Sequence, residues 1–170
     1  APPGHALNRQ LTISKNYFEG LLWRLKIPTV EDRSEFVDKA FTLQRTALKL
    51  EPYAAYIHNE MGNLYTLKGN ADSALHHYKQ ASRLSPTWAL PYANLIAYYN
   101  ALGDVNKAKE AANMARALQP DLQSIYINEA IAETRDKQWL RAEELLLHSI
   151  ALNDRHYLPY DQLGLTYAAT

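Results

Sequence analysis

The sequence contains no cysteine, which excludes disulfide bonds, thiolate metal sites and a cysteine nucleophile. The absence of cysteine does not indicate whether the protein works in an oxidising or a reducing compartment. Lysine and arginine together number 18 and are balanced by 18 aspartate and glutamate residues, so the formal net charge is zero. Binding to nucleic acid or to an anionic membrane needs a positive surplus, and we therefore expect neither partner. No apolar run approaches the ~18 residues of a membrane-spanning helix.

The sequence also lacks the short motifs that carry catalysis. It has no His-Glu-x-x-His, no glycine-rich phosphate loop and no Gly-x-Ser-x-Gly. The sequence therefore predicts a protein that is not an enzyme, with no cofactor and no metal site. Hydrophobic residues make up 47% and charged residues 21%, which is typical of a folded globular chain.

Prolines reveal an internal repeat. Pro52, Pro86 and Pro120 are spaced 34 residues apart, and each lies two positions after a leucine. One further step reaches Asp154, in the same context. Small residues recur in this frame, as in Ala74, Ala108 and Ala142, and in Gly69 and Gly103. We expect repeat units at 55–88, 89–122 and 123–156, and the beginning of another at 157–170.

Each unit is predicted to be a helix, a tight turn and a second helix. Apolar residues recur at helical spacing within the units. Gly69 and Gly103 suit the left-handed residue that ends a helix, and the following Asn70 and Asp104 suit the start of the next one. Proline then ends the second helix. Such a unit buries its apolar stripe only by stacking on its neighbours.

This pattern resembles the tetratricopeptide repeat (TPR), whose 34-residue signature is W-x2-L-G-x2-Y, then A-x3-F, then A and P. Residues 55–88 carry it as His58, Met61, Gly62, Tyr65, Ala74, Tyr78, Ala81 and Pro86. Residues 89–122 carry it as Tyr92, Leu95, Ile96, Tyr99, Ala108, Ala112, Ala115 and Pro120. Residues 157–170 carry Tyr160, Leu163, Gly164 and Tyr167. The resemblance implies an all-α fold, a right-handed superhelical solenoid of antiparallel helix pairs.

Two segments depart from the family pattern. Residues 1–54 fit only in their second half, so we expect an atypical, cap-like helix pair with a first helix at about 16–23 and an insertion around residues 26–32. Residues 123–156 are expected to form a degenerate repeat. There, Leu, Tyr, Gly and Pro of the signature are replaced by Glu129, Glu133, Lys137 and Asp154. Either the packing is locally polar or the first helix of this unit is rotated.

The resemblance also implies where a ligand binds, since a TPR superhelix lines its concave groove with one side of each first helix. In this sequence that side is rich in amides. An amide both donates and accepts hydrogen bonds, so it can pair with the backbone of an extended peptide. The candidate peptide-binding residues are Tyr56, Asn59, Asn63, Asn94, Asn128, Ile131 and Gln162. The alternative is a solvated helix face that happens to be rich in amides.

TPR domains that grip chaperone tails resemble one another in a two-carboxylate clamp of asparagines and three basic residues. The clamp positions here hold Asn59, Asn63, Asn94, Ser124 and Asn128. The asparagine positions match, but the three basic residues are missing. A terminal carboxylate would be poorly compensated without those cations, so binding to chaperone tails is not expected.

Glu129 and Glu133 lie at i and i+4, where two carboxylates suit acid–base chemistry or cation binding. The simpler alternative is ion pairing with Arg116, Arg135 or Arg141, because buried carboxylates need partners. The six histidines are expected to be surface or packing residues.

The leading hypothesis is a non-catalytic scaffold that binds a peptide segment or a neighbouring domain in its concave groove. The alternative is a regulatory or oligomerising segment of a larger enzyme, such as a kinase or a caspase-like peptidase. The first residue is not Met and the last expected helix is cut short, so we expect a fragment of a larger protein. That last helix, at about 158–169, would expose Leu163 or Tyr167, which predicts self-association through the C-terminal end.

Overall fold

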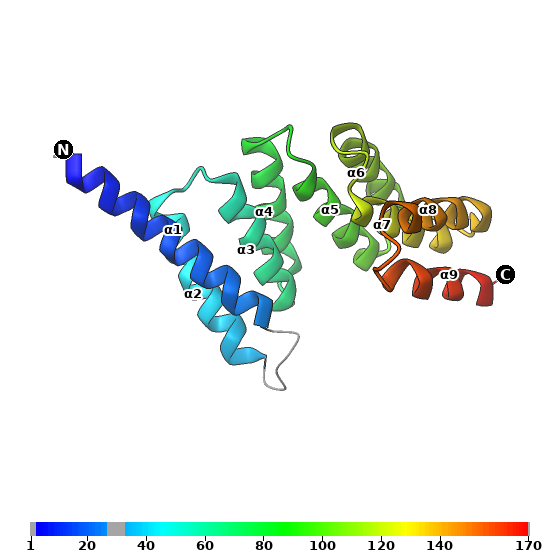
Figure 1. The fold of residues 1–170 in the computed structure, drawn as a ribbon, viewed down its shortest axis with the longest axis horizontal. Coiled ribbons are helices and arrows are strands. Elements are labelled where there is room, and N and C mark those ends of the chain that lie inside the picture. The colour runs from blue at the N-terminus through cyan, green and yellow to red at the C-terminus, as the bar shows by residue number, and fades with distance from the viewer. Residues whose placement is uncertain (1–2, 27–32, 170) are drawn as a thin grey trace. The chain divides into compact units, whose positions relative to one another are not determined.

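The computed structural model describes residues 3–26 and 33–169, which form nine α-helices and no strand (Figure 1). The helices are α1 (Pro3–Lys26), α2 (Ser34–Leu50), α3 (Ala55–Leu67), α4 (Ala71–Leu84), α5 (Ala89–Leu102), α6 (Val105–Leu118), α7 (Gln123–Arg135), α8 (Trp139–Leu152) and α9 (Leu158–Ala168). The prediction of an all-α fold is confirmed. None of these helices combines the length and the apolarity that crossing a membrane requires. Apart from Lys26, the expected insertion around residues 26–32 lies outside the described residues.

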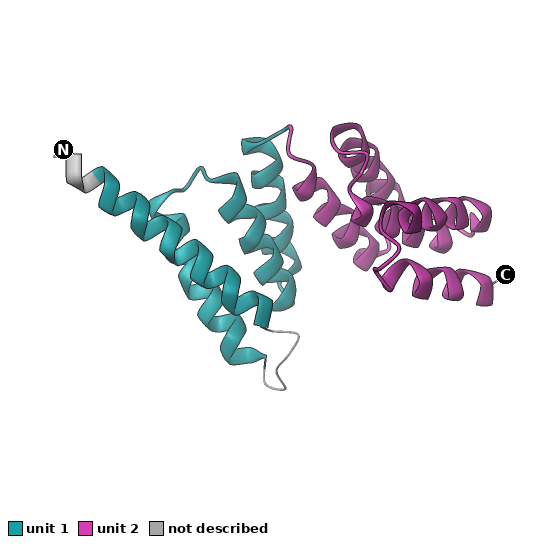
Figure 2. Ribbon diagram, viewed as in Figure 1, with its two compact units in different colours: residues 1–86 teal, residues 87–170 magenta. Residues whose placement is uncertain are grey.

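The chain divides into two compact units, residues 1–86 and residues 87–170 (Figure 2). In the first unit, α1 packs on α2 and α3 packs on α4, and α2 also packs on α3. In the second unit, α5 packs on α6 and α7 on α8, while α7 also packs on α5 and α6. The last helix, α9, packs on α7 and α8. Each unit is thus a stack of helix pairs.

The same tight turn joins the two helices of three successive pairs. Each turn contains one left-handed residue, within two positions of the end of the first helix: Gly69 (φ 71°), Gly103 (φ 75°) and Lys137 (φ 58°). Two of the turns also cap the helix that follows. The side chain of Asn70 accepts a hydrogen bond from the backbone N–H of Ser73 at 3.0 Å, and that of Asp104 accepts one from Lys107 at 3.1 Å. These bonds satisfy N–H groups that the first helical turn leaves unpaired.

Small residues allow the paired helices of the first unit to approach each other. A Cβ atom at Gly20 of α1 would lie 2.8 Å from the side-chain nitrogen of Gln44 in α2. Gln44 is fully buried and donates to the Tyr17 carbonyl at 2.8 Å. A Cβ atom at Gly62 of α3 would lie 2.4 Å from the ring of Tyr78 in α4. The two glycines therefore set the distance between the helices of each pair.

The first helix is longer than the sequence predicted. α1 begins at Pro3, whereas the pattern placed a helix at about 16–23. The TPR signature has no counterpart for the earlier residues, which was the reason for the error. The apolar residues of this segment nevertheless recur at helical spacing. Ile13 is buried, at 2% exposure, and Leu7 and Leu11 lie on the other side of the same helix. The segment before residue 16 is therefore part of the first helix pair.

The core of the second unit is built from small and aliphatic side chains. Its fully or nearly fully buried members include Ala93, Ile96, Ala108, Ala112, Ala115, Ile125, Ala130, Ala142 and Leu146. Two carboxylates, Glu129 and Glu133 of α7, are also buried, at 5% and 7% exposure. The helix pair α7–α8 thus forms in spite of its departures from the repeat signature, and its packing is locally polar.

Candidate peptide-binding surface

Tyr56 lies on α3 and is half-buried. Its hydroxyl donates to Glu51 Oε2 at 2.9 Å, and its ring stands edge-on to Tyr17 with the centroids 4.7 Å apart. Burial, together with the Glu51 carboxylate that accepts this hydrogen bond, raises the pKa of Tyr56 to about 12. The side chain is therefore neutral at physiological pH, and its exposed part offers an apolar contact.

The two asparagines of α3 differ in their accessibility. Asn63 is half-buried, and its amide donates to Glu60 Oε2 at 3.2 Å and accepts from the Tyr78 hydroxyl at 2.9 Å. Asn59 is only 4% exposed. Glu60, 3% exposed, pairs with Arg24 of α1; burial raises the pKa of Glu60, and Arg24 opposes that shift. The amides of α3 are thus used largely within the first unit.

The second unit carries the remaining candidates on neighbouring helices. Asn94 in α5, Asn128 in α7 and Gln162 in α9 occupy the same repeat position on consecutive first helices. Because α7 packs on both α5 and α9, these equivalent positions follow one another across neighbouring helices. All three side chains are half-buried, and so is Ile131, one turn after Asn128. We call Asn94, Asn128 and Gln162 the amide row.

Asn100 is a residue that sequence reasoning left out of the site. Its Nδ2 donates to the backbone carbonyl of Asn128 at 2.6 Å, which links α5 to α7. Its Oδ1 is buried and has no hydrogen-bond partner among the described residues. Asn128 itself donates to the Ser124 carbonyl at 2.9 Å. The available signal was another amide on the same side of α5, but nothing in the sequence indicates which amide is buried.

The two carboxylates of α7 are ion-paired. Glu129 accepts from Arg116 at 2.5 Å, as one of the sequence alternatives predicted. Glu133 pairs with Lys109 at 2.7 Å, a partner that the sequence did not suggest. Lys109 also pairs with Asp136 at 2.7 Å. Among the described residues no group of three or more His, Asp or Glu side chains is placed to hold a metal ion.

Two histidines face each other between α3 and α4. The Nδ1 atoms of His58 and His77 lie 2.9 Å apart, and His58 Nε2 donates to the Pro52 carbonyl at 3.0 Å. His77 stacks on Tyr65 with a centroid distance of 5.3 Å. Burial, with His58 and His76 beside it, lowers the pKa of His77 to about 4. These two rings are packing residues, since each is fixed by protein contacts.

Solved structures show that this is the tetratricopeptide-repeat fold. Pseudomonas aeruginosa pilF matches with a TM-score of 0.80 at 16% identity, over 95% of this chain and 70% of its own. The TPR protein TTC0263 of Thermus thermophilus matches with a TM-score of 0.80 at 19% identity, over 92% of this chain and 82% of its own. The first TPR of Spaghetti (RPAP3), bound to the HSP90 peptide SRMEEVD, matches with a TM-score of 0.64 at 21% identity, over 68% and 91%.

The chain thus folds as an all-α TPR repeat array, as the resemblance predicted. No protein-family model and no curated protein matches the sequence.

Proposed function

We propose that the chain is a non-catalytic protein-interaction scaffold whose second unit holds an extended peptide segment of a partner. The observation that carries this proposal is the amide row, three half-buried amides at one repeat position on the neighbouring helices α5, α7 and α9. Each amide can donate to and accept from a peptide backbone without reading the side chains of the peptide. Ile131 adds an apolar contact beside Asn128.

The spacing of the amide row suits an extended ligand. Packed helices lie ~8–10 Å apart. A peptide in the extended polyproline II conformation has three residues per turn and advances by ~3.1 Å per residue, so every third residue faces the same side and lies ~9 Å further along. Successive amides of the row would therefore meet ligand residues that are three positions apart. The spacing of neighbouring helices is therefore compatible with backbone recognition of such a peptide.

In the first unit, Tyr56 and Asn63 are the proposed contact residues. Asn59 is too deeply buried to touch a ligand, and we assign it a supporting role in α3. The Spaghetti (RPAP3) structure holds an acidic HSP90 peptide, but the clamp positions here have no cations. We therefore propose a ligand recognised along its backbone, with an affinity that depends little on salt.

The test is selection of 12-residue peptides from a random display library on the whole chain, followed by fluorescence anisotropy. The triple variant Asn94→Ala/Asn128→Ala/Gln162→Ala should weaken binding by roughly 150-fold, since each of the three lost hydrogen bonds is worth ~1 kcal/mol. The matched control is Asn106→Ala/Gln138→Ala, which removes two exposed amides outside the row. Both variants should keep the helical circular dichroism of the parent.

Two outcomes would contradict the proposal. One is equal affinity of the triple variant and the parent chain. The other is a selected peptide whose binding falls steeply with salt, because that would indicate recognition of charge rather than of backbone.

A further inference from the structure

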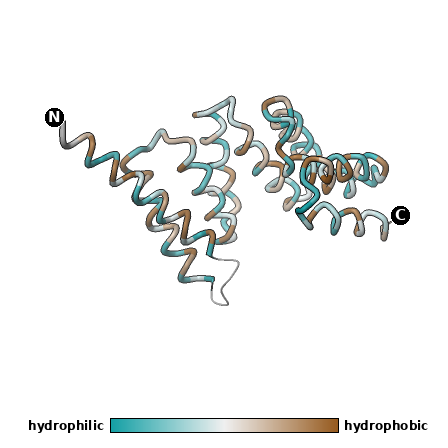
Figure 3. Tube along the Cα trace, viewed as in Figure 1, coloured by the Kyte–Doolittle hydropathy of each residue, from teal (hydrophilic) through white to brown (hydrophobic). Residues whose placement is uncertain are grey.

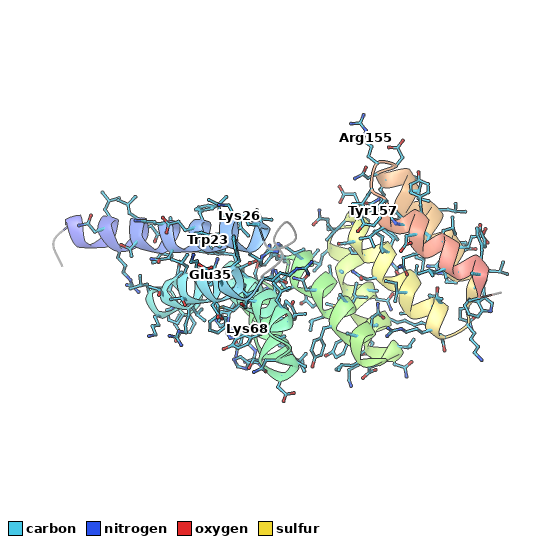
Figure 4. The ribbon with its side chains drawn as sticks, turned by 90° about the horizontal axis from the view of Figure 1, so that it is seen from below. Trp23, Lys26, Glu35, Lys68, Arg155 and Tyr157 are labelled. Atoms are coloured by element: carbon cyan, nitrogen blue, oxygen red, sulfur yellow. The ribbon has the colours of Figure 1, made fainter. Side chains whose placement is uncertain are left out.

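The helix α1 is apolar on two opposite sides. One side packs into the first unit through Ile13 and Gly20. Trp23 also lies toward α2, next to Glu35 (Figure 4). The other side carries the outer stripe, which we define as Leu7, Leu11, Phe18, Leu22 and Leu25. Each of these five side chains is 58–62% exposed.

The geometry of the outer stripe is that of a seam between two helices. At ~100° per residue, its five side chains fall within a sector of about 60°. A helix that lies on a membrane surface or covers a broad core has an apolar sector of at least ~100°, whereas a sector as narrow as this one is typical of a coiled-coil seam. Hydrophobic residues recur along the length of α1 (Figure 3). The stripe extends over about 27 Å at 1.5 Å per residue.

The spacing within the stripe is self-complementary. Leu7 and Leu25 are equally far from Asn16 along the chain, and so are Ser14 and Phe18. Leu11 and Leu22 are equally far from it to within one residue. In an antiparallel pair of α1 helices with its two-fold axis near Asn16, each leucine therefore meets a leucine. The ring of Phe18 faces Ser14 of the other copy, and this small side chain leaves space for the ring.

The charges beside the stripe agree with this arrangement. Lys15 and Glu19 lie on the same flank of the stripe and near its centre. Within one chain they are 4.0 Å apart and exposed. In the antiparallel pair, the flank of one helix faces the same flank of the other. With the two-fold axis between residues 16 and 17, Lys15 of each copy lies within one residue of the position that faces Glu19 of its partner. A lipid surface offers Lys15 no carboxylate partner of this kind.

From these observations we infer that the outer stripe of α1 is a self-association surface, on which α1 of a second copy of this chain packs antiparallel. The inference stands independently of the proposed peptide site, because it uses only the first unit. A seam of this length is smaller than a standard interface of ~1,600 Å², so the dimer dissociates in the range of roughly 1–100 µM.

Sedimentation equilibrium of the whole chain, from about 1 µM to 0.5 mM, tests the inference. The parent chain should show a reversible monomer–dimer equilibrium. Phe18→Glu and Leu22→Glu should each weaken it at least ~10-fold, as truncation of a central contact does. Both side chains are exposed in the single chain, so the circular dichroism and the melting temperature should stay unchanged.

Two exposed leucines elsewhere provide matched controls. Leu140→Glu on α8 (79% exposed) and Leu165→Glu on α9 (56% exposed) should leave the dimer intact. The second control also tests the C-terminal self-association that the sequence predicted. The inference is overturned by a parent chain that is monomeric at every concentration. It is equally overturned by a dimer that Leu165→Glu abolishes and Phe18→Glu does not.

The orientation has its own test, because the chain has no cysteine of its own. Leu7→Cys mixed with Leu25→Cys should form disulfide-linked dimers between the two variants on mild oxidation. Either variant alone should crosslink much less, since in the antiparallel pair equivalent ends lie far apart. Crosslinking of each variant with itself would show a parallel pair and contradict the inference. Binding of the parent to anionic phospholipid vesicles, lost in Phe18→Glu and without any dimer in solution, would assign the stripe to membranes instead.

Discussion

Gly62 and Gly164 occupy the same repeat position, but in different surroundings. A Cβ atom at Gly62 would lie 2.4 Å from the ring of Tyr78, which is 4% exposed and held by hydrogen bonds, whereas a Cβ atom at Gly164 would meet nothing within 4 Å. We expect Gly62→Ala to lower the free energy of unfolding by about 1–3 kcal/mol through overpacking. Gly164→Ala should leave it unchanged or raise it by up to ~1 kcal/mol, because alanine favours helix. Urea unfolding followed by circular dichroism measures both, and a shift of the same size and sign in the two variants would be inconsistent with this packing.

The burial of His77, beside His58, makes the stability of the first unit depend on pH. An unfolded histidine titrates near 6.5, whereas His77 in the fold has a pKa of about 4. Between these values the unfolded chain binds more protons, so stability is fully present above pH 6.5 and is lost as the pH falls toward 4. We expect the free energy of unfolding to fall by about 1–2 kcal/mol. This is less than the difference in pKa alone would give, because the ring is partly solvated.

Melting temperatures between pH 7 and pH 4.5 measure this effect. His77→Gln should flatten the pH dependence, while His76→Gln, at the exposed neighbouring position, should retain it. An unaltered pH profile in His77→Gln would mean that another group causes the loss.

At the scale of an element, the turn between α7 and α8 is the one of the three equivalent turns whose left-handed residue is not glycine. Lys137 has φ 58° where the equivalent turns have Gly69 and Gly103. A side chain in the left-handed region costs ~1–2 kcal/mol per residue. Lys137→Gly should therefore stabilise the second unit by up to about 1 kcal/mol in urea unfolding, whereas Gly103→Ala should destabilise it by about as much. Destabilisation by Lys137→Gly would show that the lysine side chain makes a contact worth more than the strain.

Repeat spacing predicted the elements that depend on local chemistry. The turns at Gly69 and Gly103 and the caps at Asn70 and Asp104 all follow from residues near one another in the chain. These features were predictable because each requires a particular small or polar residue at a fixed position.

Features that depend on distant residues were not predictable in the same way. Lys109 reaches Glu133 only because α6 packs beside α7. The burial of Asn59 and the bond from Asn100 to the Asn128 carbonyl likewise depend on which neighbour covers each side chain. The extent of α1 was missed because it lies outside the repeat signature. The candidate site was therefore predictable as a set of positions, but not as a set of accessible groups.

For the whole molecule, the two compact units imply that stability is not uniform along the chain. Repeat arrays behave approximately as sums of unit stabilities and neighbour terms, and parts of them open separately. Leu146 in α8 is fully buried in the second unit, so Leu146→Ala should destabilise that unit by about 2–5 kcal/mol through a cavity.

Native-state hydrogen exchange on Gly62→Ala and Leu146→Ala would therefore separate the units. We expect Gly62→Ala to lower the protection of amides in α3 and α4 while those in α7 and α8 keep the values of the parent chain, and Leu146→Ala to do the reverse. The physical reason is that each substitution disturbs packing inside one unit, and local opening costs only the contacts of that unit. Equal loss of protection across all helices in both variants would instead mean that the array unfolds as a single cooperative body.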